Sequence, residues 1–443
     1  MKRNVPISIN LAVAALISIF FFGCKILQKP ITSNDTHGLS LAVKNPYFLF
    51  LSDVHLDVQR KFTVMGEDTG TDLWNNCKKK IDSLVNSVNP PAFVLYTGDM
   101  PVHYQCDKDK NCFLPTLPDS LTVQHASSIK AVLKGFSDLV ATSKIPFLYV
   151  PGNNDALDGN YYSFSSHDYP AYPFSLINEP SYPYQPFHIS KLPIADGAYM
   201  ISDSNVWAGY YTAKVMKGLR MICLNTVIWG TTFRGMDENG HKKMGDDEMV
   251  WLKNQLAEAK DSGDNVYLAM HIPPGIDAYA KTDMWKTFDR EQPWQNTFLS
   301  LMNRYRQIVA GIFYGHTHFD ELRLFYDTPD NTPIQVAISC PGISTEHKNN
   351  PAFKTVNFDP VNKIPMDFTT YYSNPQANSW GDSTYTFSSV FNAKDRNSIY
   401  KTLRKMKMKY IEKDMNLIYT AKSNFLFNDS KAGIKVKPIP IKP

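Results

Sequence analysis

Short, almost uninterrupted apolar runs alternate along the chain with longer stretches in which apolar residues recur at helical spacing. The runs are typical of buried strands and the longer stretches of amphipathic helices. This alternation favours an α/β fold whose ligand site lies at the carboxyl ends of the strands. The expected strands are 47–51, 92–96, 145–150, 219–225, 266–270, 308–312 and 334–338. The expected helices are 71–88, 120–142, 245–261 and 294–306, and helix-like segments follow residue 371, notably 394–419.

A narrow set of polar residue types directly follows five of these strands. The residues are Asp53, His55, Asp99, Asn153, His271, His316 and His318. Two histidines two positions apart in an extended chain lie on one side of it, about 7 Å apart. His316 and His318 can therefore bind one metal ion, or one ion each of a close pair. Taken singly, an Asp or Asn after a strand is usually a turn former or helix cap, but the repetition on five strands favours one shared site.

The residue types indicate what such a site would hold. Imidazole nitrogens with carboxylate and amide oxygens, and no thiolate, suit zinc, iron or manganese. Seven ligands exceed what one tetrahedral ion uses, whereas two ions about 3.5–4 Å apart that share a bridging carboxylate would use them all. The sequence therefore predicts two divalent metal ions, with zinc as the first choice and iron or manganese as alternatives.

The order of these motifs is that of a known superfamily. Asp53-x-His55, Gly98-Asp99, Gly152-Asn153, His271 and Gly315-His316-x-His318 resemble the calcineurin-like metallophosphoesterase signature. Within it, segments 98–103 and 315–322 are similar to the acid sphingomyelinase-like phosphodiesterases. The resemblance extends from about residue 48 to the helical C-terminal region. It implies two packed mixed β-sheets flanked by helices, with the metals at the strand ends between the sheets. The helix-like segments beyond residue 371 predict a helical C-terminal extension.

The resemblance also implies which residues hold each metal and how the reaction proceeds. One ion would be held by Asp53, His55, Asp99 and His318. The other would be held by Asp99, Asn153, His271 and His316, with Asp99 bridging. A metal-bridging hydroxide would then attack phosphorus in line, and His103, at the position of a family histidine near the leaving group, would protonate the departing alkoxide. The alternative for His103 is a partly buried loop histidine.

One position departs from the family pattern. The family usually carries His directly after the metal-binding Asn, and here the residue is Asn154. That His stabilises or protonates the transition state, whereas Asn can donate a hydrogen bond to a phosphoryl oxygen but cannot deliver a proton. Loss of a general acid costs roughly 10²–10⁴ in rate. We therefore expect His103 to carry proton donation alone, with Asn154 as a hydrogen-bond donor.

Composition bounds the class of protein. The 443 residues include 43% apolar, 13% aromatic and 20% charged residues, which is typical of a folded globular chain with a large core. The net charge is +4, with 46 basic and 42 acidic residues. The chain therefore lacks the strong overall positive charge that would favour a nucleic-acid polymer as partner. The pattern does not specify an oligomeric state.

The N-terminal segment predicts export. Lys2 and Arg3 precede an apolar stretch, 7–22, that is short for a membrane span of about 20 apolar residues. The segment 1–24 ends in Phe-Phe-Gly-Cys24 and resembles a bacterial lipoprotein signal whose cysteine is lipidated after cleavage, although the two phenylalanines are poor lipobox matches. An ordinary signal peptide and an uncleaved anchor are the alternatives. Each places the rest outside the cytoplasm, as an anchored lipoprotein, a periplasmic protein or a secreted one.

The remaining chain divides into a polar linker and a catalytic region. The predicted divisions are a linker at 25–45, a metallophosphoesterase domain at 46–370, a helical subdomain at 371–430 and a tail at 431–443. Cys106 and Cys112 flank a polar loop and can bridge in an exported protein. Cys223 and Cys340 lie in apolar runs and are expected as buried thiols.

Two features bear on the substrate, and each has two interpretations. The insertion 161–187, rich in Tyr, Phe and Pro, can hold choline by cation–π contact or stack a nucleobase, or its rings can pack on one another. The basic residues Lys401, Arg404, Lys405, Lys407 and Lys409 can contact an anionic membrane surface or form a solvated helix face. The resemblance implies a phosphodiester substrate, either a phosphocholine lipid such as sphingomyelin or a nucleotide-type compound. A phosphomonoesterase, or a binding protein that retains the metals without turnover, is the alternative.

Overall fold

The computed structural model places residues 45–443 in one compact unit. It describes residues 46–103, 119–141, 143, 145–157, 159–162, 199–202, 208–277, 281–288, 291, 293–326, 333–376, 380–393, 397–422 and 435–436. The predicted signal segment with Cys24, the linker, the pair Cys106 and Cys112, and all but the start of the aromatic insertion lie outside the described residues.

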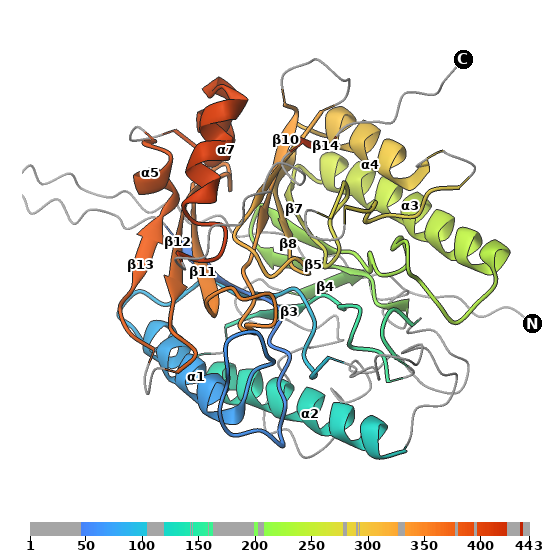
Figure 1. Cartoon of the computed structure of the whole chain (residues 1–443). Coiled ribbons are helices and arrows are strands. Elements are labelled where there is room, and N and C mark those ends of the chain that lie inside the picture. Colours follow the sequence, from blue (N-terminus) through green and yellow to red (C-terminus); the bar gives the residue numbers. More distant parts are fainter. Residues whose placement is uncertain are drawn as a thin grey trace, which may run out of the picture. The chain divides into compact units, whose positions relative to one another are not determined.

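Two mixed β-sheets form the centre of this unit (Figure 1). The first has the order β13-β12-β11-β1-β2-β3 and the second the order β14-β9-β10-β8-β7-β6-β5-β4. The first sheet contains β1 (Tyr47–Leu51), β2 (Val94–Tyr96), β3 (Phe147–Tyr149), β11 (Ala352–Phe358), β12 (Pro365–Tyr372) and β13 (Thr384–Thr386). The second contains β4 (Tyr199–Ser202), β5 (Tyr211–Met216), β6 (Leu219–Cys223), β7 (Asn265–Ala269), β8 (Val309–Tyr314), β9 (Leu322–Phe325), β10 (Gln335–Ser339) and β14 (Lys435–Val436).

The strands that carry the predicted ligands run parallel within each sheet. In the first sheet β1 pairs with β2, and β2 with β3, in parallel. In the second, β6, β7, β8 and β10 pair in parallel in that order. The outer strands β11, β12 and β13 of one sheet and β4, β5 and β9 of the other pair antiparallel. Each sheet therefore collects the carboxyl ends of its central strands at one edge, and the predicted fold of two mixed sheets is confirmed.

Helices cover the outer faces of the two sheets (Figure 1). The pair α1 (Thr71–Val85) and α2 (Asp119–Ala141) covers the first sheet, and the pair α3 (Glu238–Asp261) and α4 (Pro293–Arg304) covers the second. The buried side chains of α1 include Leu73, Cys77 and Ile81, four residues apart, so one stripe faces the sheet. Helix α3 begins before the predicted residue 245, because Asp237 accepts a hydrogen bond from Gly240 N at 2.7 Å and caps an earlier turn.

Aromatic side chains hold the two sheets together. The ring of Phe48 in β1 lies edge-on to Phe313 in β8, with centroids 5.1 Å apart, and 5.8 Å from Tyr267 in β7. All three are fully buried, and burial of one such side chain stabilises the fold by about 1.5–3 kcal/mol. A second cluster, which includes Trp229, Trp285 and Phe298, packs α4 on the opposite face of the second sheet. These layers fix the relative positions of the strand ends.

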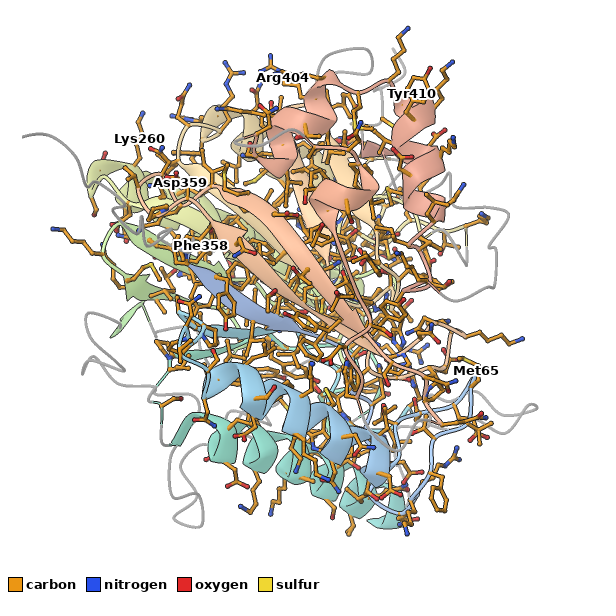
Figure 2. The ribbon with its side chains drawn as sticks, turned by 90° about the vertical axis from the view of Figure 1, so that its left-hand side faces the viewer. Met65, Lys260, Phe358, Asp359, Arg404 and Tyr410 are labelled. Atoms are coloured by element: carbon orange, nitrogen blue, oxygen red, sulfur yellow. The ribbon has the colours of Figure 1, made fainter. Side chains whose placement is uncertain are left out.

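The C-terminal region contains strands as well as the predicted helices. Strand β13 pairs with β12, and the helices α5 (Phe387–Val390), α6 (Ile399–Lys405) and α7 (Met408–Asn416) follow. The single helical stretch expected at 394–419 is divided, because Met406 and Lys407 are extended (ψ 145° and 139°). Side chains of α6 and α7 such as Arg404 and Tyr410 point outward, whereas Phe358 of β11 is buried (Figure 2). The region therefore extends the first sheet as well as adding helices.

The described cysteines are buried thiols. Cys77, Cys223 and Cys340 are unpaired and buried, which confirms the expectation for Cys223 and Cys340. Within the described ranges, no helix is both long and apolar enough to cross a membrane.

Candidate metal centre

The predicted ligand residues come together where the carboxyl edges of the two sheets meet. Ligand atoms of Asp53, His55 and Asp99, which follow β1 and β2, all lie within 4.8 Å of one another. Those of Asp99, His271 and His316 meet the same limit, although the two histidines follow β7 and β8 of the other sheet. The site therefore takes its ligand atoms from both sheets, with Asp99 in both groups.

The remaining two predicted ligands join the same cluster. Asn153, which follows β3, has its Oδ1 2.9 Å from His271 Nε2. His318 Nε2 lies 3.5 Å from Asp53 Oδ1. All seven predicted ligand residues thus lie within one cluster, in which Asn153 is next to His271 and His318 is next to Asp53.

The spacing of the donor atoms fits shared metal ions. The Nε2 atoms of His55 and His271 lie 3.4 and 3.3 Å from Asp99 Oδ2. Two ligands each about 2.1 Å from one ion stand about 3.4 Å apart at the tetrahedral angle. His55 Nε2 is buried and has no hydrogen-bond partner among the described residues. A divalent ion would give this nitrogen the partner that a buried polar atom requires.

Hydrogen bonds outside the cluster turn the ligand atoms inward. His55 Nδ1 lies 3.0 Å from Pro101 O, and His271 Nδ1 lies 2.6 Å from Thr97 O. A carbonyl oxygen only accepts, so each Nδ1 donates a proton to its carbonyl and each Nε2 is the nitrogen that faces the cluster. The Asn153 amide donates from Nδ2 to Asn160 Oδ1 at 2.8 Å, which directs Oδ1 into the site.

The backbone at the cluster is strained. The residues with positive φ include Asp53 (51°), His55 (42°), Asp99 (62°), His316 (72°) and His318 (59°). This region costs a residue with a side chain roughly 1–2 kcal/mol. Five predicted ligands share it, and such strain persists where the surroundings over-determine it, often at functional sites.

Buried Asp155 supports part of this strained backbone. Its carboxylate accepts hydrogen bonds from the backbone N–H groups of Asp99, Met100 and Gly152 at 2.7–3.0 Å, and from Tyr149 Oη at 2.7 Å. Asp155 thereby joins the loop after β3, which carries Asn153, to the loop after β2, which carries Asp99.

Two glycines of the motifs are required by close approach. A Cβ at Gly152 would lie 2.1 Å from Asp99 Oδ1, and one at Gly315 would lie 2.0 Å from Ser52 Oγ. Any side chain at these positions would displace a ligand residue or its neighbour. Glycine at these two motif positions therefore allows the loops to pack closely against the ligand residues.

The histidines of the cluster fall into two electrostatic classes. Burial lowers the pKa of His316 to about 4 and also lowers that of His318, whereas the carboxylates have the opposite effect on His55 and His271. Burial alone would raise the pKa of Asp99, but His271 and His55 lower it well below its ordinary value. Burial alone would lower the pKa of His55 and of His271, yet Asp53 and Asp99 raise both to about 9. The surroundings of His55 and His271 therefore favour positive charge, as the surroundings of a cation do. The donor set and its spacing thus fit divalent metal ions.

His103 lies beside the cluster with an acidic partner. Its ring stacks on that of His55, with centroids 3.7 Å apart. Its Nδ1 lies 2.6 Å from Asp68 Oδ1, and its backbone N–H donates to Asp68 Oδ2 at 2.8 Å. Burial tends to raise the pKa of Asp68, but the charge of His103 lowers it to about 2. The ionised carboxylate holds the Nδ1 proton and leaves Nε2 available.

Asn154 is turned toward Asp99. Its backbone N–H donates to Asp99 Oδ1 at 2.8 Å, and its side-chain Nδ2 donates to Asp99 Oδ2 at 2.9 Å. Its own Oδ1 is buried without a partner among the described residues. The amide therefore orients the predicted bridging carboxylate, which the sequence did not anticipate.

A hollow of about 220 Å³ opens above the cluster. Predicted residues that line it include Asp99, His103, Asn153, Asn154, His316 and His318. Tyr161, the first ring of the aromatic insertion, also lines it, in line with one of the two interpretations of that insertion. Residues that line it without having been predicted include Asp277, Glu346 and His347. These, like Asp68, lie in irregular segments with no periodicity. The pairing of Asp68 with His103 spans 35 positions, and no pattern in the sequence marks it.

Comparison with known proteins identifies similar chains. Residues 46–320 match the family model described as calcineurin-like phosphoesterase. Sphingomyelin phosphodiesterase 1 of Caenorhabditis elegans is 30% identical over 240 residues, which cover 52% of this chain and 37% of the relative. The cyclic GMP-AMP phosphodiesterase SMPDL3A of Mus musculus is 31% identical over 192 residues, which cover 41% of each chain. The chain thus spans less than half the length of these two relatives.

Among solved structures, a dimetal phosphatase from Danio rerio is 11% identical with a TM-score of 0.46. The similarity covers 77% of this chain and 98% of that one.

Proposed function

The chain belongs to the calcineurin-like phosphoesterase family, and from this premise we propose that it is an exported, metal-dependent phosphodiesterase. The observation that carries the proposal is the position of Asp99, whose carboxylate lies between His55 and His271 at 3.4 and 3.3 Å. A carboxylate between two imidazoles from different sheets is the arrangement that a bridging ligand needs. The named relatives act on phosphodiesters. They support a diesterase over the alternatives of a phosphomonoesterase or a binding protein.

The cluster would hold two divalent ions in the two halves described above. Asp53, His55, Asp99 and His318 would hold one, and Asp99, Asn153, His271 and His316 the other. Zinc is the first choice because the donors are imidazole, carboxylate and amide. Bound ions of this kind lower the pKa of water to near neutrality and offset charge on the phosphoryl oxygens.

His103 would donate the proton to the leaving alkoxide. Asp68 accepts a hydrogen bond from Nδ1 of His103, which leaves Nε2 for proton transfer at the hollow. Stacking on His55 sets the plane of the ring. Asp68 therefore acts on the substrate through His103, as a positioning residue.

Asn154 would act through Asp99. Its two hydrogen bonds to that carboxylate fix both oxygens before a metal binds, which lowers the cost of assembling the site. Because the amide carries no transferable proton, proton donation falls to His103.

The substrate would be a phosphodiester with a positively charged head group. Asp277 and Glu346 line the hollow together with the ring of Tyr161. Two carboxylates in the lining favour a cation and disfavour further anionic groups, and an aromatic ring can contact a quaternary ammonium. These residues support a phosphocholine lipid over a nucleotide-type substrate.

Hydrolysis assays test the proposal directly. We expect turnover of bis(p-nitrophenyl) phosphate, weaker turnover of p-nitrophenyl phosphate, and release of phosphocholine from sphingomyelin in mixed micelles. Glu346→Gln should weaken the use of sphingomyelin while leaving bis(p-nitrophenyl) phosphate turnover nearly unchanged. Preferential turnover of the monoester would overturn the diesterase assignment. Equal loss on both diesters in Glu346→Gln would overturn the assignment of the head-group site.

A further inference from the structure

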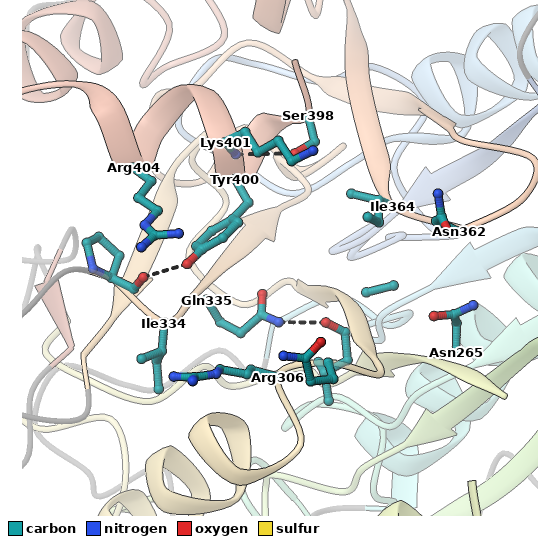
Figure 3. A pocket seen from close by; sticks show the side chains of 14 residues that line it. Asn265, Arg306, Ile334, Gln335, Asn362, Ile364, Ser398, Tyr400, Lys401 and Arg404 are labelled. Carbon is teal, nitrogen blue, oxygen red and sulfur yellow. Dashed lines mark hydrogen bonds between the residues drawn. The ribbon is translucent and has the colours of Figure 1, made fainter. Parts of the chain in front are cut away.

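A larger hollow lies at the other end of the second sheet. It has a volume of about 700 Å³ and is lined at the start of β7 by Asn265, at the start of β8 by Val309 and at the start of β10 by Gln335 (Figure 3). The metal cluster lies at the opposite ends of β7 and β8. Six residues of β8 separate these ends by about 20 Å, at about 3.3 Å per residue. This hollow, the basic hollow, is therefore separate from the candidate metal centre.

The charge of the basic hollow has one sign. Arg306, Lys401 and Arg404 line it, and its described lining contains no Asp or Glu. Arg306 Nη1 donates to the neutral side chain of Asn303 at 3.1 Å. Within the part of the chain that the structure describes, none of the three cations pairs with a carboxylate. Three cations that lack a carboxylate partner create a positive potential in the hollow. Such a potential attracts an anion with more than one negative charge.

The walls that carry these cations are fixed. Tyr400 Oη donates to Pro333 O at 2.7 Å, which ties α6 to the segment before β10. Gln335 Nε2 donates to Val309 O at 2.6 Å and joins the starts of β10 and β8. In Figure 3, Arg404 and Tyr400 extend from α6 on one wall, and Arg306 lies on the opposite wall. Anchored walls reduce the ordering cost of binding.

The lining also indicates the kind of anion. The volume lies within the range of about 300–1,000 Å³ for small-molecule sites and exceeds that of a bare phosphate. Ile334, Ile364 and the ring of Tyr400 add apolar surface to the lining. Guanidinium groups bind phosphate in a bidentate geometry. The ligand therefore needs a phosphate group at one end and an apolar or aromatic part at the other.

We propose that the basic hollow binds an organic phosphate, with its phosphate group between Arg306 and Arg404 and its organic part against Ile334 and Tyr400. The shared chemistry is a phosphate ester, either as a free small molecule or as the head group of an anionic lipid. In this proposal Lys401 and Arg404 of α6 bind an anion. The inference does not rest on the proposed activity.

Calorimetry with two probes tests the proposal on the full-length, metal-loaded protein. One probe is phenylphosphonate, a phosphate-ester mimic whose carbon–phosphorus bond phosphoester hydrolysis does not cleave. The other is a set of phosphatidylcholine vesicles with and without phosphatidylglycerol. The variant Arg306→Gln/Arg404→Gln removes two lining cations. The matched variant Lys405→Gln/Lys407→Gln removes the same charge from exposed positions outside the lining.

The expected result is a loss of affinity of about tenfold per arginine removed, and little change in the matched variant. Hydrogen exchange should show protection of segment 398–406 by the bound probe. Specific binding of phenylphosphonate assigns a free organic phosphate, and binding that needs phosphatidylglycerol assigns a lipid head group. Absence of binding by either probe, equal losses in the two double variants, or protection confined to segment 314–319 would overturn the proposal.

Discussion

The two ends of β7 and β8 differ in how their functional side chains are held. At the carboxyl end, His271 and His318 are almost fully buried, and five predicted ligands have positive φ. At the amino end, Arg306 and Arg404 are exposed and have ordinary backbone conformations. The first arrangement holds donor atoms at fixed spacing, as metal binding requires. The second presents long cations that can adjust to an anion.

This contrast predicts that metal removal affects only one end. Dialysis against a chelator should abolish turnover of bis(p-nitrophenyl) phosphate, because the buried carboxylates and imidazoles would lose their shared cation. Added zinc should restore the rate. Calorimetry with phenylphosphonate should still detect the basic hollow in the metal-free protein. Turnover that survives complete removal of metal, verified by elemental analysis, would contradict the assignment.

The next largest effect is expected at His103. His103→Ala should lower turnover by roughly 10²–10⁴ on substrates with a poor leaving group, because the departing alkoxide needs a proton. With p-nitrophenolate, which leaves without protonation, the loss should be small. Asp68→Asn should show the same dependence on the leaving group with a smaller loss. A loss that is equal for both kinds of leaving group would place His103 outside proton transfer.

A smaller change is expected at Asn154. Asn154→Ala removes the bond from Nδ2 to Asp99 Oδ2 but keeps the backbone bond to Oδ1. We expect metal affinity to fall by about 10–100-fold, as is typical when a partner of a ligand is removed. Titration with a chromophoric chelator measures this affinity. Asn303→Ala, at the other end of the sheet, is the control and should leave it unchanged. Unaltered affinity in Asn154→Ala would refute the positioning role.

The last prediction concerns stability, at Glu248 of α3, a buried carboxylate that contacts the segment after β6 and is not paired with any described histidine. Glu248 is fully buried and accepts a hydrogen bond from Asn225 N at 2.7 Å, and burial raises its pKa from 4.5 to about 8. The folded state therefore holds this proton more tightly than the unfolded state. Its contribution to stability is complete below pH 4.5 and is lost as the pH rises toward 8.

Glu248→Gln should remove this part of the pH dependence. Denaturant unfolding from pH 5 to 8 should then show a shallower decline in the free energy of unfolding across this range. Glu258→Gln, on the exposed face of the same helix, is the control. Identical pH profiles for wild type and Glu248→Gln would show that Glu248 does not titrate in this interval.

The same contrast explains what the sequence could predict. The candidate ligands follow strands directly, and glycines that pack against them recur in the same motifs, so local pattern was sufficient to single out all seven. The alternation of strands and helices indicated an α/β fold, whereas the arrangement in two mixed sheets followed from the family resemblance. Asp68, Glu346 and His347 reach the site through irregular segments, and no period marks them. Arg306 and Arg404 share the basic hollow only because α6 packs near the start of β8. Such contacts depend on tertiary packing and lie outside the reach of local patterns.

The central claim is that Asp99 bridges two metal ions. The most direct measurement is the metal content per chain of wild type and Asp99→Asn, together with their turnover of bis(p-nitrophenyl) phosphate. The control variant is Asp247→Asn, in which an exposed carboxylate is changed in the same way. We predict about two ions per chain in wild type and in the control, and a lower content with turnover abolished in Asp99→Asn. Full metal content with undiminished turnover in Asp99→Asn would contradict the account.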